Sequence, residues 1–332
     1  MTNHERNFWQ AMNQGNKEQL TKLMKGSLFQ KPVPIDFRNE QGRMAVFDIF
    51  DANKPEMLEW LINCGLNKNS KTDTGHTLLD MTLLYKWNQQ LQYLLDIGTK
   101  LQGVYKYNSE FWDEYIYEKG EDNLLALVNA GVPCTKDKKS KNTPLCMAVE
   151  HNFTKLAFEM LERGALVNEK NSNQQTALHI AAKNNNVIII QELIKRNADI
   201  NVIDENEKTP LYIATENFKK GAVMELLKTK SNINAVCTNR KTALHVACVW
   251  CDLDVIEAFI NTGANVNAVS AYTLTPLHIA AEYDKSIDSI ILNKLITAGA
   301  NIFAVDYNNK TPLQIAQESH NENAFILLGK YA

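Results

Sequence analysis

The sequence predicts an all-α fold, a solenoid of about ten helix-turn-helix units joined by short hairpin loops. Two observations predict it. Short Thr-x-Leu anchors recur at a nearly constant spacing, and apolar residues with helical periodicity follow each anchor. A fixed period of this length is typical of repeat arrays, in which each unit packs only against its neighbours.

Six anchors have the pattern Thr, then Pro or Ala, then Leu. They begin at Thr143, Thr176, Thr209, Thr242, Thr275 and Thr311. The first five threonines lie 33 residues apart, and the sixth lies 36 residues after the fifth. The register continues upstream through Glu110, Thr77 and Met44 with weaker motifs. A last match begins at Arg6 with Phe8, Ala11 and Met12, after a short insertion near Pro32 and Pro34.

Each unit is expected to form two helices. Thr is a good N-cap, Pro suits the first helical position, and a small pair such as Ala181-Ala182 lets neighbouring inner helices approach closely. A second apolar stretch such as residues 187–194 fits an outer helix with one buried face. Most outer helices are followed by a glycine that can adopt the left-handed conformation. These are Gly65, Gly98, Gly131, Gly164, Gly263 and the shifted Gly299, with Asn197 as a substitute and Lys230 as a departure.

We expect one continuous array in two stretches. Residues 1–142 form divergent repeats with an N-terminal cap, and residues 143–332 form well-matched repeats with a C-terminal cap. The terminal units should have polar outer faces, because a solenoid otherwise exposes its stacking surface.

These motifs resemble the ankyrin-repeat family, whose consensus reads Thr-Pro-Leu-His, then Ala-Ala, then Gly-Ala-Asp-Val-Asn at this spacing. The resemblance is most specific from Thr143 to Ala332. It implies two layers of helices, hairpins that project from one side, and a concave groove lined by hairpins and inner helices. It also implies that the groove binds a partner protein and that the chain is a non-enzymatic scaffold.

Composition excludes several other classes of function. The chain is 45% hydrophobic and 22% charged, as expected of a soluble globular protein. The net charge of −3 and the lack of a basic face argue against a nucleic-acid partner. The longest apolar stretch, residues 187–190, is far too short to cross a membrane. We therefore expect a cytoplasmic monomer whose cysteines are reduced.

No residues form a recognisable catalytic or cofactor site, so we expect no enzyme activity, no cofactor and no metal. Cys248 and Cys251 have the spacing of a redox pair or half a zinc site. They fall at the end of an inner helix, and Cys248 occupies the buried small-residue slot, which favours a structural role. His179, His245 and His278 recur as the fourth residue of the anchor, where the resemblance implies hydrogen bonds to hairpin backbone.

The partner-binding residues are predicted from the positions that line the groove in this family. Counted from the anchor Thr, these are the fourth, third and first residues before it and the seventh and eighth after it. The middle units carry polar residues there, whereas later units carry Val249, Trp250, Tyr272, Leu274, Tyr283 and Tyr307. A second cluster comprises His76, Leu84, Tyr85, Tyr107 and Tyr117. Exposed aromatic residues on consecutive units mark binding surfaces, although Trp250 and Tyr283 could instead fill gaps between inner helices.

Two other interpretations remain open. The divergent segment 27–134 is rich in aromatic residues and could carry an enzymatic or lipid-facing function, with the repeats as a targeting module. From the resemblance alone, the chain is also similar to stand-alone ankyrin arrays that intracellular bacteria export into the host cytosol. Residues 317–328 then resemble an export signal, but a final outer helix would have the same apolar spacing.

Overall fold

The computed structural model describes residues 2–26, 33–38, 43–85, 87–99, 109–135, 141–250 and 252–331. The chain divides into two compact units, Met1–Pro133 and Cys134–Ala332. In the described residues the regular structure is helical, and β-structure is limited to three isolated bridges. Each bridge joins an anchor residue to the hairpin six residues before it, as in Lys71 with Thr77.

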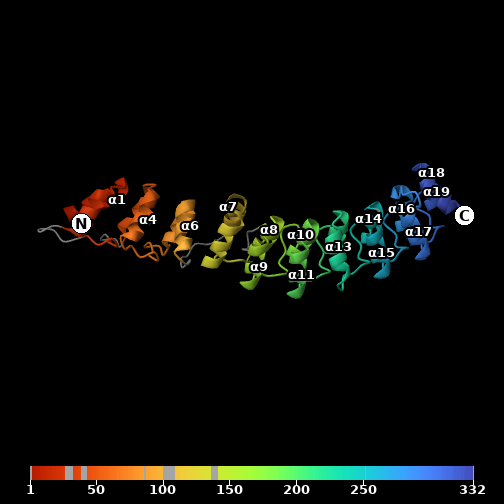
Figure 1. Cartoon of the computed structure of the whole chain (residues 1–332), viewed down its shortest axis with the longest axis horizontal. Coiled ribbons are helices and arrows are strands. Elements are labelled where there is room, and N and C mark those ends of the chain that lie inside the picture. The colour runs from red at the N-terminus through yellow and green to blue at the C-terminus, as the bar shows by residue number, and fades with distance from the viewer. Residues whose placement is uncertain are drawn as a thin grey trace. The chain divides into compact units, whose positions relative to one another are not determined.

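The second unit contains six helix pairs that follow one another in chain order (Figure 1). The inner helices α8 to α18 pack each on the next, as do the outer helices α9 to α17, which gives two layers. The pairs are α8 (Pro144–Glu150) with α9 (Thr154–Glu162), α10 (Ala177–Asn184) with α11 (Val187–Lys195), α12 (Pro210–Glu216) with α13 (Lys220–Leu227), α14 (Ala243–Trp250) with α15 (Leu253–Asn261), α16 (Pro276–Tyr283) with α17 (Ile290–Thr297), and α18 (Pro312–Glu318) with α19 (Glu322–Gly329).

The first unit contains four further pairs in the predicted register. They are α1 (Asn3–Gln14) with α2 (Lys17–Lys25), η1 (Ala45–Phe47) and α3 (Asp48–Asp51) with α4 (Glu56–Asn63), α5 (Leu78–Leu84) with α6 (Asn88–Asp96), and the two halves of α7 (Ser109–Ala130). The backbone of α7 leaves helical geometry at Gly120 (φ 72°), so this element is an inner and an outer helix joined at one glycine. The described residues therefore hold ten pairs, and the predicted helical solenoid is confirmed.

The anchor motif explains where the inner helices begin. The Thr209 hydroxyl accepts a hydrogen bond from the Tyr212 amide at 3.2 Å, which caps the helix N-terminus. Three units carry His179, His245 or His278 at the fourth anchor position. The Thr242 amide donates to His245 Nδ1 at 3.1 Å, so Nε2 bears the proton and donates to the Leu274 carbonyl of the next hairpin at 3.0 Å. The same ring therefore caps its own helix and holds the following unit.

The helix ends follow the predicted glycine rule. All six predicted glycines have φ between 74° and 110°, and Asn197 has φ 62°. Lys230, which stands at the glycine position of its repeat, does not adopt the left-handed conformation. Instead, the hydroxyls of Thr229 and Ser231 donate to the Leu226 carbonyl at 2.6 and 2.9 Å and close that helix end. The departure at Lys230 is thus compensated by neighbouring side chains.

A ladder of four asparagines also joins consecutive units. The Asn201 side chain accepts a hydrogen bond from the Asn232 amide at 2.6 Å and donates to the Lys230 carbonyl at 3.2 Å, both in the next unit. Asn168, Asn234 and Asn267 each make the equivalent two contacts to the unit that follows them. Because each side chain satisfies one amide and one carbonyl, it fixes the position of one outer-helix end against the next.

The 36-residue spacing after Thr275 lengthens the turn between α16 and α17. Asp284, which is buried, accepts hydrogen bonds from the amides of Ile291 and Leu292 at 2.9 and 3.3 Å. Its other carboxylate oxygen accepts from the Ser286 hydroxyl at 2.6 Å. This carboxylate caps α17 from within the longer turn, and the stacking of the helices is kept.

We expect the stability of the second unit to fall as the pH falls from about 6.5 to about 4. Burial lowers the pKa of His245 to about 4, and it also lowers the pKa values of His179 and His278. These rings stay neutral when folded but gain a proton when unfolded, so their contribution is complete above the unfolded pKa and is lost toward the folded one. For His245 the loss is about 3 kcal/mol at pH 4. Urea unfolding followed by circular dichroism at several pH values would measure it.

His245→Gln is the matched control for this prediction. Gln314 occupies the same anchor position in the last unit, where its side chain accepts the Thr311 amide at 2.8 Å without titrating. The variant should lose some stability at pH 7 and should show a shallower decline toward pH 4 than the wild type. Identical pH profiles for the two proteins would contradict the assignment.

Candidate functional site

The surface formed by the hairpin tips and inner helices of the second unit, here called the inner-helix face, carries the predicted binding residues. Within a repeat, an ion pair can link the hairpin edge of this face to the edge formed by the C-terminal end of the inner helix. Lys208 before the anchor reaches Glu216 at the end of α12 (2.7 Å), and Lys310 reaches Glu318 at the end of α18 (2.5 Å). Residues just before the anchor and seven after it therefore face each other across the inner helix.

Backbone hydrogen bonds hold successive hairpin tips in a row. The amides of Glu205, Thr238 and Ala271 donate to the carbonyls of Asn173, Asn206 and Asn239, at 3.2, 3.3 and 2.9 Å. The row continues from the Tyr307 amide to the Tyr272 carbonyl at 3.2 Å. Side chains at the tips are thus presented at fixed intervals by a continuous backbone.

Two of the predicted tyrosines meet on adjacent hairpin tips. The Tyr272 and Tyr307 rings have centroids 5.7 Å apart with an interplanar angle of 55°. Both are exposed, Tyr307 by 65%. Leu274 lies half-buried two residues after Tyr272 on the same hairpin. The structure therefore brings the two tyrosines together.

The other three predicted residues lie at the ends of the inner helices. Val249 and Tyr283 are exposed, whereas Trp250 is half-buried. Trp250 packs edge-on against Phe218 of the preceding unit, with ring centroids 5.8 Å apart. Trp250 therefore both fills a gap between units and contributes part of its surface to the face.

Phe218 is a residue of this cluster that the sequence analysis missed. It is 53% exposed, and its φ of 56° is a left-handed conformation that is strained for a bulky side chain. Asn152 and Asn185 occupy the same place, nine residues after the anchor, with φ of 57° and 59°. Asn tolerates this conformation, so an exposed phenylalanine at an asparagine slot was the available signal.

The predicted first-unit residues lie around a separate pocket. His76 and Leu84 line a cavity of about 250 Å³ together with Phe47, Asp51 and Met81. The Tyr85 hydroxyl donates to the Asp51 carboxylate beside it, and this contact raises the pKa of Tyr85. Arg43, also on the pocket wall, pairs with Asp51 at 2.6 Å.

Two predicted residues cannot be placed on this pocket. Tyr107 lies outside the described residues, as does the side chain of Tyr117. The assignment of these two residues to the first-unit cluster stays a prediction.

Other chemistry in the described part of the chain is limited. Cys248 is fully buried in the small-residue slot of α14, and Cys251 lies outside the described residues. Burial raises the pKa of the Cys134 thiol to about 11, which makes it a poor nucleophile. No cluster of His, Cys, Asp or Glu in the described ranges has a geometry that would hold a metal ion. Within those ranges no helix is both long and apolar enough to cross a membrane.

Sequence comparison agrees with this architecture. A model of three ankyrin repeats matches residues 115–204 and 189–270, and a model of a single ankyrin repeat matches residues 273–307. The chain belongs to the ankyrin-repeat family. No curated protein shows a significant match to the chain. Ankyrin repeats are generally protein-interaction modules.

These findings give no support to an enzymatic or lipid-facing segment at 27–134. Both halves of α7 lie in the register of an ankyrin repeat, and the family match already begins at residue 115. Trp112, one of the aromatic residues of this segment, serves packing, because it is buried and its indole donates to the Pro133 carbonyl at 3.3 Å.

Replacing Phe218 should separate its backbone strain from its ring contact. Phe218→Asn and Phe218→Ala both remove the ring packed on Trp250, but only Asn tolerates the left-handed conformation. We expect the Asn variant to be more stable than the Ala variant by about 1 kcal/mol. Urea unfolding of the two variants would measure this difference. Equal stabilities, or a more stable Ala variant, would show that the turn carries no strain.

Proposed function

We propose that this ankyrin-repeat protein is a non-catalytic scaffold that binds a partner protein on its inner-helix face. The apolar cluster of Val249, Trp250, Tyr283 and Phe218, with the Tyr272 and Tyr307 pair on the hairpin tips, is the principal contact. Exposed aromatic residues on consecutive units are the observation that carries this proposal. Tyr and Trp are the side chains that most often dominate binding energy at protein interfaces.

The charge pattern of the face supports the same location. The ion pairs Lys208–Glu216 and Lys310–Glu318 span the face in the units anchored at Thr209 and Thr311. In the two units between them, the corresponding residues are Lys241 with Val249 and Leu274 with Glu282, so this ion pair cannot form. The cluster thus lies mainly in the stretch that lacks this ion pair, between two units that have it, which is compatible with an interface core inside a polar rim.

The first-unit pocket is a second surface suited to a protein partner. Its floor is apolar, and its rim carries Arg43, Asp51 and Asp73. A cavity of about 250 Å³ fits one inserted side chain better than a metabolite of ordinary size. We propose that His76, Leu84 and Tyr85 contribute to this smaller contact.

The affinity test compares apolar and polar positions of the same face. A random peptide library displayed on phage and selected on the full chain would supply a fluorescent probe peptide. Trp250→Ala combined with Tyr283→Ala should weaken the probe's binding at least ten-fold, because aromatic hot spots typically cost about 2 kcal/mol or more each. Fluorescence anisotropy would measure the dissociation constants.

Two further variants protect the test from a folding artefact. Lys183→Ala with Asn217→Ala alters polar positions of the same face and should change affinity by less than about three-fold. Phe218→Asn should weaken binding while it spares the fold, since Asn suits that turn. Unchanged affinity in both the aromatic double variant and Phe218→Asn would remove the binding site from this cluster.

A further inference from the structure

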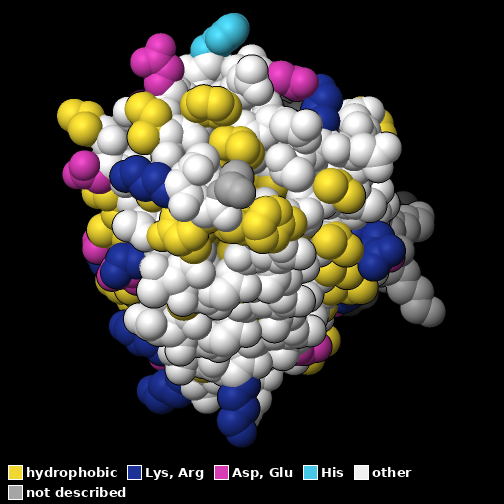
Figure 2. Space-filling view, turned by 90° about the vertical axis from the view of Figure 1, so that its right-hand side faces the viewer, with side chains coloured by type: hydrophobic (Ala, Val, Ile, Leu, Met, Phe, Trp, Pro, Cys, Tyr) yellow, Lys and Arg dark blue, Asp and Glu magenta, His cyan; other side chains and the backbone are white. Residues whose placement is uncertain are grey.

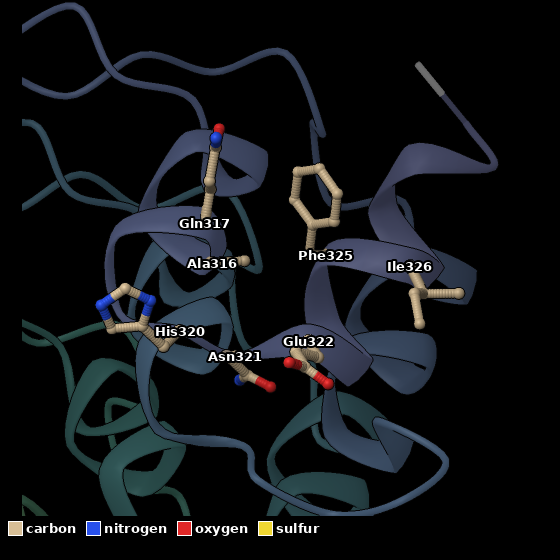
Figure 3. Close-up of a pocket in the computed structure, with 7 residues that line it drawn as sticks. All are labelled: Ala316, Gln317, His320, Asn321, Glu322, Phe325 and Ile326. Carbon is tan, nitrogen blue, oxygen red and sulfur yellow. The ribbon is translucent and has the colours of Figure 1, made fainter.

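The outer face of the last helix pair is only partly polar. Between α18 and α19 lies an open pocket of about 330 Å³ lined by Ala316, Gln317, His320, Asn321, Glu322, Phe325 and Ile326. Viewed from the end of the molecule where the C-terminus lies, hydrophobic side chains gather in a band between charged ones (Figure 2). The Phe325 ring projects from α19 across from Gln317 on α18 (Figure 3).

Phe325 occupies a position that is buried in every earlier pair of the second unit. The residue fourteen places after the anchor is Ala157, Ile190, Val223 or Ile256, and Leu292 takes this place after the longer turn; all are fully buried. Phe325 is 41% exposed. By contrast, α18 carries the exposed Gln317 where the earlier inner helices bury a small or apolar residue such as Ala182 or Ala281. The polar end face expected from the sequence is therefore present on α18, while α19 keeps an apolar stacking position.

Ile326, the next residue, departs from the contact that joins earlier outer helices. At this position Gln191 donates to Glu225 of the next unit at 3.0 Å, and Glu257 pairs with Lys294 of the next unit at 2.6 Å. Ile326 is 59% exposed and cannot make such a polar contact. A neighbour that follows the pattern of this array would set a charged residue against it, so α19 favours a neighbour that presents an apolar side chain.

We propose that α19 pairs with α19 of a second copy of this chain, antiparallel about a two-fold axis near Ile326. In this arrangement Phe325 and Ile326 of one copy meet the same residues of the other, so apolar surface covers apolar surface. Glu322 and Lys330 are both exposed, and each lies four residues from Ile326 on opposite sides. An antiparallel pairing therefore sets each Glu322 against Lys330 of the other copy, which makes the patch self-complementary as a two-fold interface requires.

This self-association is separate from the proposed partner binding and uses a different surface. It replaces the monomer expected from the sequence with a monomer–dimer equilibrium. One short helix per copy buries little area, so the dimer should be weak and should form mainly at high protein concentration. The two-fold contact is closed, so the mass should stop at two copies.

Sedimentation equilibrium of the full chain from about 1 µM to about 300 µM tests the proposal. The wild type should pass from monomer to dimer within this range. Ile326→Asp should remove the dimer, and Glu322→Lys should raise the dissociation constant about ten-fold because it sets like charges against each other. The double variant Glu322→Lys/Lys330→Glu restores opposite charges and should return to within about three-fold of the wild type. This rescue distinguishes the antiparallel pairing from a nonspecific apolar contact.

Phe303→Asp is the matched control. Phe303 is 65% exposed in the hairpin that precedes α18, but it does not line the pocket between α18 and α19. This variant should leave the equilibrium unchanged, and circular dichroism should show that all variants stay folded. A wild type that is monomeric at every concentration would overturn the proposal. So would a mass that grows beyond two copies, a dimer that survives Ile326→Asp, or a charge exchange that fails to rescue Glu322→Lys.

Discussion

No helix pair in this protein can bury its apolar side by itself, and the rest of the structure depends on that constraint. In the second unit, consecutive pairs are joined by side chains that reach forward into the next pair. The imidazole of His245 caps its own helix and holds the following hairpin, and the amide of Asn201 holds the following outer-helix end. Both reach about 30 residues along the chain, which is why the repeat length stays so regular. An insertion or deletion that moves the next hairpin and outer-helix end out of reach would break both kinds of contact at once.

The features that could be predicted from the sequence follow local rules. Helix starts follow from Thr anchors, helix ends follow from glycines, and Phe8, Ala11 and Met12 form the buried face of α1 as their spacing indicates. Those rules act over a few residues, so one sequence suffices to apply them. They recovered all ten helix pairs in the described residues, including the bent α7 with its weak motif.

The features that could not be predicted depend on pairs of distant residues. Trp250 is only partly exposed, and the Phe218 ring of the preceding repeat packs edge-on against it. The Tyr85 hydroxyl is engaged by Asp51, 34 residues earlier, which no periodicity indicates. The residue seven places after the anchor is Lys183, Glu216 or Val249 in different repeats, so no local rule fixes the side chain at this slot.

The turn at Asp284 shows where this architecture can take up additional residues. One carboxylate satisfies the amides at the start of α17 and the hydroxyl of Ser286, so the added length is held by the turn itself. The core positions on both sides keep their burial, as Ala281 and Leu292 show. An insertion between the two helices of a repeat can therefore be accommodated without loss of stacking. The same turn is a natural place to graft a foreign loop without disturbing the neighbouring repeats.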